Sequence, residues 1–159
     1  MEDYFLKIDG IPGESRDVKH KDEIDLVSFS WGVAQSGGGP GVGVGAGAGR
    51  PRFSGFQFVM KLNKASPQLF LACASGKHIK EANLSVRGAG GKAQLEYLKI
   101  KFTDVLVSSF EESGGGDRPE ESVSFNFGKI EVDYSPQQET GAAGGAISAS
   151  WDLSANIKG

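Results

Sequence analysis

Hydrophobic and polar residues alternate along most of this chain. The alternation has a period of two residues, at which the side chains of a β-strand reach the same face of a sheet. It predicts about seven strands. Their ranges are Tyr4–Ile8, Ile24–Trp31, Arg52–Lys61, Glu81–Arg87, Leu95–Ser109, Ser122–Tyr134 and Ala146–Leu153.

The larger apolar side chains of these strands define the buried face of the predicted sheet. We expect the core to contain Val27, Phe29, Trp31, Phe56, Phe58, Met60, Ala82, Leu84, Val86, Leu98, Ile100, Phe102 and Leu106. The small alternates Ser28 and Ser30 would then face outwards. Within Ser122–Tyr134 the apolar positions change from odd to even numbers at Gly128-Lys129. One extra residue there would restore the apolar face, so we expect a β-bulge at this point.

A single helix is predicted at Ser66–Ser75. Ser66 is a suitable N-cap, Pro67 fits the first helical position, and Gly76 fits the position after the last turn. The expected apolar face consists of Leu69, Phe70, Leu71 and Cys73. A helix this short is marginal alone, so it should pack on the sheet, over one open end of a barrel.

Long polar loops separate several of the predicted elements. Ser36–Gly49 reads SGGGPGVGVGAGAG, and a compact monomer gains little from ordering so many glycines. The run is either a disordered tether or a loop that becomes ordered only against another molecule. Glu111–Glu121 is expected to be a second loop, either solvated or used for docking. The fold class is therefore mainly β: a single β-barrel or sandwich domain over residues 1–159, with one short helix and long glycine-rich loops.

Composition excludes several classes of function. The net charge is −3, so no basic field exists to hold nucleic acid or an anionic membrane. Cys73 is the single cysteine, which rules out an internal disulfide. The chain shows no signal-peptide pattern and no apolar stretch long enough for a membrane span. We therefore expect a soluble protein made in the cytoplasm and, if exported, exported without a cleaved leader.

Candidate chemical groups have simpler structural interpretations. The glycines match no phosphate-binding motif. His20 lies among acidic residues and is expected in a solvated loop, whereas His78, with Lys77 and Lys80, is expected to cap the helix C-terminus. Cys73 is expected to be a buried structural thiol. No catalytic, cofactor-binding or metal-binding residue is assigned.

Several strings in this sequence resemble the haemolysin co-regulated proteins (Hcp). The matching strings are Phe5–Ile11, Gly13–Ser15, His20–Asp25, Ser30–Gly32, Gln35–Gly37, Ser66-Pro67, Ser75–Ile79, Arg87 with Gly90-Gly91, Glu96–Lys99, Trp151–Leu153 and Asn156. They cover nearly the whole chain in order, and the departures lie in the glycine run and around Glu111–Arg118. The resemblance implies a tube protein of the bacterial type VI secretion system. Such proteins form a β-barrel with an extended loop and a helix, and they assemble as hexameric rings.

The resemblance also implies partners, and together with the strand pattern it leads to a hypothesis about sites. Rings would stack into a hollow tube, driven outwards by a contractile sheath beneath a spike protein, and the lumen could carry effector proteins. We expect Ser28 and Ser30 to face the lumen. The loop that touches another protomer or ring is expected to contain Gly37, Gly39, Gly41, Gly43, Gly45, Gly47, Gly49, Arg50 and Arg52.

Two other classes of function remain open from the residues. The chain could be a monomeric barrel that holds a ligand inside, with the glycine run as a lid. It could also be an enzyme that uses His20 or His78 with nearby carboxylates. A mass measurement in solution separates the ring from the lidded barrel.

Overall fold

The computed structural model describes residues 2–35, 49–88, 95–137 and 144–159. Within them the chain forms eleven strands and one helix, which confirms the mainly β prediction. The elements are β1 (Asp3–Ile8), β2 (Ile24–Asp25), β3 (Ser28–Ser30), β4 (Val33–Gln35), β5 (Pro51–Phe53), β6 (Phe56–Lys61), α1 (Ser66–Ser75), β7 (His78–Arg87), β8 (Glu96–Ser113), β9 (Glu120–Tyr134), β10 (Ile147–Asp152) and β11 (Ile157–Lys158).

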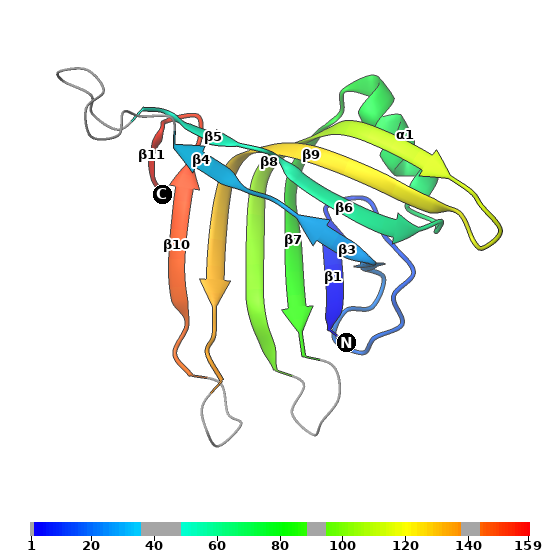
Figure 1. Cartoon of the computed structure of the whole chain (residues 1–159), viewed down its shortest axis with the longest axis horizontal. Helices are drawn as coiled ribbons and strands as arrows, with labels where there is room; N and C mark the ends of the chain where they lie inside the picture. The colour runs from blue at the N-terminus through cyan, green and yellow to red at the C-terminus, as the bar shows by residue number, and fades with distance from the viewer. Residues whose placement is uncertain (1, 36–48, 89–94, 138–143) are drawn as a thin grey trace.

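Nine strands form one antiparallel sheet that folds over into two layers (Figure 1). Its main order is β11-β10-β9-β8-β7-β1-β2, and β6 joins β9 to β3. The long strand β9 connects the layers, because residues 129–134 pair with β10 and residues 120–125 pair with β6. At the opposite corner the chain crosses between the layers. The Leu26 N–H donates to the Tyr4 carbonyl at 3.0 Å, and the Val27 N–H donates to the Val59 carbonyl at 2.7 Å. The result is a barrel-like arrangement.

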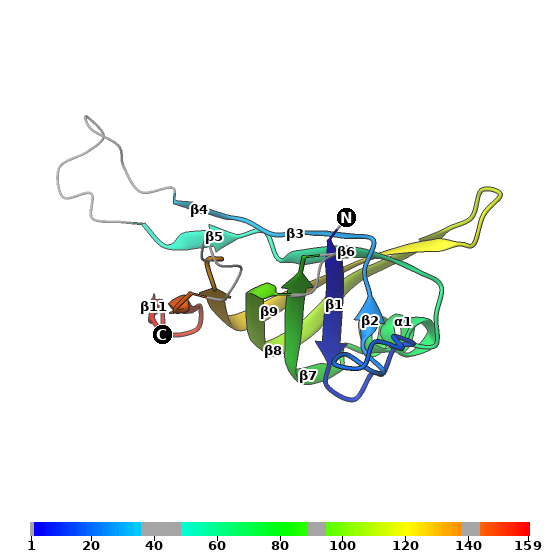
Figure 2. The ribbon, with the colours of Figure 1, turned by 90° about the horizontal axis from the view of Figure 1, so that it is seen from below.

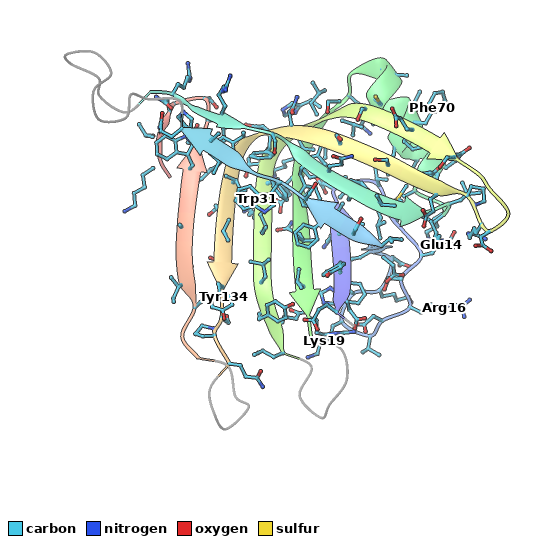
Figure 3. The ribbon with its side chains drawn as sticks, viewed as in Figure 1. Glu14, Arg16, Lys19, Trp31, Phe70 and Tyr134 are labelled. Carbon is cyan, nitrogen blue, oxygen red and sulfur yellow. The ribbon has the colours of Figure 1, made fainter. Side chains whose placement is uncertain are left out.

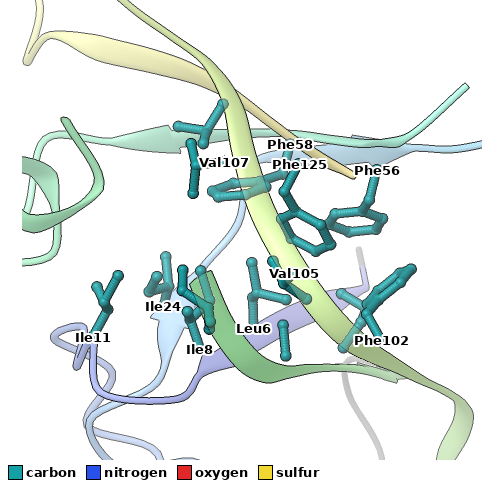
Figure 4. Close-up of a cluster of buried hydrophobic side chains, with 14 of the residues drawn as sticks. Leu6, Ile8, Ile11, Ile24, Phe56, Phe58, Phe102, Val105, Val107 and Phe125 are labelled. Carbon is teal, nitrogen blue, oxygen red and sulfur yellow. The ribbon is translucent and has the colours of Figure 1, made fainter. Parts of the chain in front are cut away.

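Aromatic rings fill the space between the two layers (Figure 4). Phe56, Phe58, Phe102 and Phe125 are fully buried. The Phe56 ring centroid lies 4.8 Å from that of Phe102 and 5.0 Å from that of Phe125. The predicted inward positions of β6 and β7 are confirmed, since Phe56, Phe58, Met60, Ala82, Leu84 and Val86 are all buried.

The predicted change of face at Gly128 exists, but it is not a one-residue bulge. Phe127 and Ile130 are both buried, as the sequence pattern requires. However, the pairing register is unchanged, with Thr103 opposite Lys129 and Val105 opposite Phe127. Both strands change face together, because Asp104 adopts a left-handed φ of 57° opposite Gly128.

The change of face in β8 also corrects the predicted position of Leu106. Beyond Asp104, Val105 and Val107 point into the core and Leu106 is exposed. A register shift in the β8–β9 ladder occurs instead between Val107 and Ser109. Glycine at 128 permits the close approach, since a Cβ there would lie 3.2 Å from the Asp104 Cβ.

Two of the predicted strands are each divided in the structure. Ile24–Trp31 becomes β2 and β3, because the chain moves from β1 to β6 at Leu26-Val27. Val27 is consequently exposed, which corrects its predicted core position, whereas Phe29 and Trp31 pack against the core from partly buried positions. Arg52–Lys61 becomes β5 and β6, separated by Gly55 with a φ of 79°.

The helix has the predicted bounds but different details. Ala65, not Ser66, is the N-cap residue, and no side chain caps the helix there. Gly76 has a φ of 67° and closes the C-terminus as predicted. Leu69 is buried, but Phe70 and Leu71 are exposed, so only part of the expected apolar face meets the core. No helix among the described residues is long and apolar enough to span a membrane.

The predicted loop Glu111–Glu121 is mostly a β-hairpin. β8 continues to Ser113 and β9 begins at Glu120, so the loop itself is only 114–119. Cross-strand pairing extends to Ser113 opposite Glu120. The polar residues that suggested a solvated loop instead form this hairpin, which we call the β8–β9 arm. This arm and the β4–β5 ribbon project from opposite ends of the molecule (Figure 2).

Candidate functional site

The outward side of the β3–β6–β9 layer presents small polar side chains. Ser30 lies opposite Gln57, Gln57 opposite Ser124, and Ser124 opposite Ser109, so one polar row crosses four strands. A second row begins with Ser28 and leads through Val59 to Ser122. We call the set Ser28, Ser30, Gln57, Ser109, Ser122 and Ser124 the small-polar face.

The small-polar face contains both residues that the sequence predicted to face outwards. Ser28 and Ser30 are exposed on β3. Gln57, Ser122 and Ser124 were not predicted as part of this face, although each is the polar alternate between buried aromatic or aliphatic residues. The Gln57 Nε2 donates to the Ser122 Oγ at 3.2 Å, which joins β6 to β9 across this face. These six residues are uncharged, whereas towards the β8–β9 hairpin the same side carries charge, with Glu111 opposite Ser122 and Lys61 paired with Glu120.

The outward side of the β7–β10 layer is charged instead. Lys99 lies opposite Asp133, and Lys101 lies opposite Glu131. Their neighbours Ile100 and Phe102 are buried, so these charged side chains point away from the core. We call this the charged face. The two outer faces of the barrel therefore differ in chemistry.

Exposed apolar side chains occur on elements at opposite sides of the ribbon (Figure 1), with Tyr134 on one side and Phe70 on the other (Figure 3). The β10 flank consists of Val33, Tyr134, Ile147 and Ile157. The helix flank consists of Val18, Val27, Phe70 and Leu71. Each flank includes an end of the main sheet, because β11 and β2 are the terminal strands of its order. Unpaired strand edges and exposed apolar side chains are both suited to contact another chain.

A cavity of about 340 Å³ lies between the β4–β5 ribbon and the β9–β10 part of the sheet. Its lining includes Trp31, Phe53 and Trp151. The Trp151 Nε1 is buried and has no hydrogen-bond partner among the described residues. Arg50, next to the outer end of the ribbon where Gln35 pairs with Pro51, donates from Nη2 to the Leu153 carbonyl at 3.3 Å. The ribbon is thus attached to the β10 flank.

The glycine loop predicted as a contact site lies mostly outside the described residues. This applies to Gly37, Gly39, Gly41, Gly43, Gly45 and Gly47. Gly49, Arg50 and Arg52 are described, and both arginines are exposed. Arg52 belongs to β5 and pairs with Ala34 of β4, whereas Ser28 and Ser30 belong to β3. The two predicted sites therefore lie on different parts of the molecule (Figure 1).

The environment of His20 differs from the predicted solvated loop. Only 6% of His20 is exposed. Its Nδ1 lies 3.0 Å from the Glu23 Oε1, and its Nε2 contacts the Glu96 carboxylate. Its ring stacks on Phe5 with a centroid distance of 4.3 Å. The prediction is wrong because Glu96, distant in sequence, and Phe5 together supply a polar and an aromatic partner.

The other candidate groups show no shared site. His78 is exposed at the start of β7, and its Nε2 lies 3.5 Å from the Asp104 Oδ1. The helix carbonyls of Ala72 and Cys73 accept backbone N–H groups from the turn at Gly76. Cys73 is partly buried against the core. Across the described ranges, no group of three or more His, Cys, Asp or Glu residues could hold a metal ion.

Comparison with known proteins places these features in a family. The family model described as "Type VI secretion system effector, Hcp" matches residues 5–134. The chain is 44% identical to Protein hcp1 of Pseudomonas aeruginosa over 159 residues, which cover 98% of each protein.

Solved structures give the same result. A crystal structure of Hcp1 from Salmonella typhimurium matches with a TM-score of 0.81 and 39% identity, over 99% of this chain and 98% of that chain. A structure described as a type six secretion system protein matches with a TM-score of 0.91 and 31% identity over the full length of both chains. This chain therefore belongs to the Hcp family of type VI secretion system proteins.

Proposed function

We propose that this protein is the structural subunit of the secretion tube. Six copies form a ring, and rings stack into a hollow tube that a contractile sheath drives outwards beneath a spike protein. The observation that carries the proposal is the pair of unlike flanks on opposite sides of the barrel. The β10 flank and the helix flank each combine exposed apolar side chains with an end of the sheet.

The relation between the two flanks favours a ring. Because the flanks are made of different residues, contact between them joins two copies head to tail. A head-to-tail contact closes into a ring when the rotation between neighbours divides a full turn. Such closure would cover the unpaired sheet edges and the apolar side chains of every subunit at once. The family resemblance supplies the expected number of six.

The two outer barrel faces support an assignment of inside and outside. We place the small-polar face, with Ser28 and Ser30, towards the lumen and the charged face towards the exterior. Small uncharged side chains offer few strong contacts, so effector proteins would be held weakly and released. The ribbon with Gly49, Arg50 and Arg52, and the glycine run that it carries, would reach a neighbouring protomer or ring.

The proposal extends to export. The tube subunit is made in the cytoplasm and leaves with the contracting machine, without a cleaved signal peptide. No cofactor, metal ion or catalytic step is part of the proposal.

The native mass of the purified protein tests ring formation. We expect a particle of about six chains, because the two apolar flanks are exposed in one chain. Ile147→Lys, on the β10 flank, should reduce the mass to that of one chain, since a charge would be buried in the contact. The matched control is Leu106→Lys, which changes another exposed aliphatic residue outside both flanks. A wild-type protein that remains a single chain at high concentration contradicts the ring.

A separate prediction concerns the lumen. Ser30→Arg should leave the native mass unchanged but lower the amount of effector protein that co-purifies, by severalfold, because six bulky charges would enter the channel. Ser85→Arg is the control, since Ser85 lies on the charged face opposite Lys99. Equal retention of the effector by both variants would contradict the placement of Ser30 in the lumen.

One observation favours the alternative of a ligand-binding monomer with a glycine-rich lid. The cavity lined by Trp31, Phe53 and Trp151 lies directly under the ribbon that carries the glycine run. The barrel interior itself is filled by phenylalanine rings, so a ligand would occupy this outer cavity. The same mass measurement distinguishes the alternatives, since the lidded barrel requires only one chain.

A further inference from the structure

Two carboxyl groups face each other at the base of the β8–β9 arm. Glu112 on β8 lies directly opposite Glu121 on β9. Glu121 is only 1% exposed, and on its other side β6 contributes the apolar Met60. Like charges directly opposite each other in a ladder destabilise it, and a buried unpaired charge is costly. The pair therefore requires something that neutralises one of the two charges.

The hydrogen bonds of Glu121 leave one oxygen without a protein donor. The Ser66 hydroxyl, in the first turn of α1, donates to the Glu121 Oε1. The Glu121 Oε2 is buried and has no donor among the described residues. Glu112, opposite Glu121 in the ladder, is the carboxyl that interacts with it. A proton on one of these two carboxyls would supply the missing donor.

The other charged groups nearby do not neutralise the pair. Glu111, Glu112, Glu120 and Glu121 line the same notch of about 450 Å³, together with Val59, Ser113 and Ser122. The neighbouring cation, Lys61 on β6, pairs with Glu120 at 3.0 Å. Helix α1 contributes the neutral Ser66. Burial, followed by the contact with Glu112, raises the pKa of Glu121 to about 7.

We propose that Glu112 and Glu121 share one proton and form a pH-sensitive latch at the base of the arm. In the closed state the protonated carboxyl donates to its neighbour across the β8–β9 ladder. Loss of the proton leaves two negative charges opposite each other. The Ser66 hydroxyl continues to hold Glu121, whereas Glu112 is exposed and has no such anchor. The end of β8, from Glu112 to Ser113, is therefore the part that separates.

The direction of the pH effect follows from linkage. The pKa of Glu121 is higher in the folded chain than its ordinary value of 4.5, so the folded chain binds the proton more tightly than the unfolded chain. The resulting stability is fully present below pH 4.5 and is lost as the pH rises to about 7. The inference concerns a single chain and does not depend on ring formation.

Carbon-13 NMR of the glutamate carboxyls tests the shared proton. We expect one titration step with an apparent midpoint near pH 7, belonging to the Glu112–Glu121 pair. Glu112→Gln should move the midpoint of this step to lower pH, because the like charge is gone and the amide can donate to the ionised Glu121, while the burial of Glu121 remains. Glu111→Gln, the same change at the adjacent residue, should leave the midpoint unchanged. The proposal is overturned if every glutamate of the wild-type protein titrates below about pH 5.

Opening of the arm is measured by amide hydrogen exchange, corrected for the intrinsic rate at each pH. Between pH 4.5 and the midpoint at about pH 7, the protection of the amides at the end of the hairpin should fall by roughly tenfold for each unit of pH. Glu121→Gln should abolish this change, since its amide can bond both Ser66 and Glu112 without a titrating proton. Equal protection on both sides of the midpoint in the wild-type protein would also overturn the latch.

Discussion

Replacing Phe56 with alanine is expected to lower the free energy of unfolding by about 3–5 kcal/mol. The Phe56 ring is fully buried and lies between the two layers of the sheet. It contacts the rings of Phe29, Phe58, Phe102 and Phe125. These residues belong to four strands that cannot all close around a smaller side chain, so a cavity should remain. Urea unfolding monitored by tryptophan fluorescence measures the loss.

The matched control for this substitution is Phe70→Ala. Phe70 is 58% exposed on α1, and the centroid of its ring lies 6.3 Å from that of Phe110. For the unfolding of a single chain, its removal should cost less than about 1 kcal/mol, because Phe70 is already largely exposed there. Similar losses for the two variants would show that the barrel interior is not the main source of stability.

The sequence predicted this core correctly wherever a strand keeps the same side towards the interior along its length. In β6 and the first half of β9, buried aromatic residues alternate with Gln57, Ser122 and Ser124, and the pattern alone identifies the inner side. The same pattern indicated a change of face at Gly128. It could not show that Asp104, in another strand, adopts a left-handed conformation to change face at the same level.

The burial of charged groups could not be predicted from local composition. Glu121 lies in an acidic stretch that is typical of solvated loops, yet its carboxyl is enclosed by Met60, Ser66 and Glu112. His20 likewise lies among charged neighbours, but Glu96 and Phe5 enclose it. In both cases a partner distant in sequence is needed, Ser66 for Glu121 and Glu96 for His20. Burial of this kind depends on strand pairing, which a single sequence does not reveal.

The candidate assembly surfaces were predictable only in part. Ser28 and Ser30 followed from alternation, but the full small-polar face requires the register of four strands. The two apolar flanks combine residues from the loop before β2, from α1 and from strands at both ends of the sheet. The alternation within one segment cannot show which residues of other segments lie on the same side of the molecule. The predicted contact glycines 37–47 lie outside the described residues, so their role stays a prediction.

Arg87→Met is expected to lower the free energy of unfolding by about 2–3 kcal/mol. The Arg87 side chain is 5% exposed, and its Nη2 donates to the Asp17 Oδ2 at 2.7 Å and to the Asp3 Oδ2 at 3.0 Å. Its guanidinium also lies 5.0 Å from the Phe5 ring centroid. Methionine preserves much of the apolar packing but leaves both carboxylates without their cation. The expected loss is below that of a fully buried pair because both aspartates are partly exposed.

The dependence on pH distinguishes lost charge pairing from lost packing in Arg87→Met. The hydrogen bond from Arg87 lowers the pKa of Asp17 from 3.8 to about 2. Stability from this pairing is therefore present above pH 3.8 and is lost as the pH falls towards 2. The difference in unfolding free energy between wild type and Arg87→Met should shrink over that interval, whereas a packing defect would persist unchanged. Arg16→Met, at an exposed position in the same loop as Asp17, should alter stability by no more than about 0.5 kcal/mol at any pH.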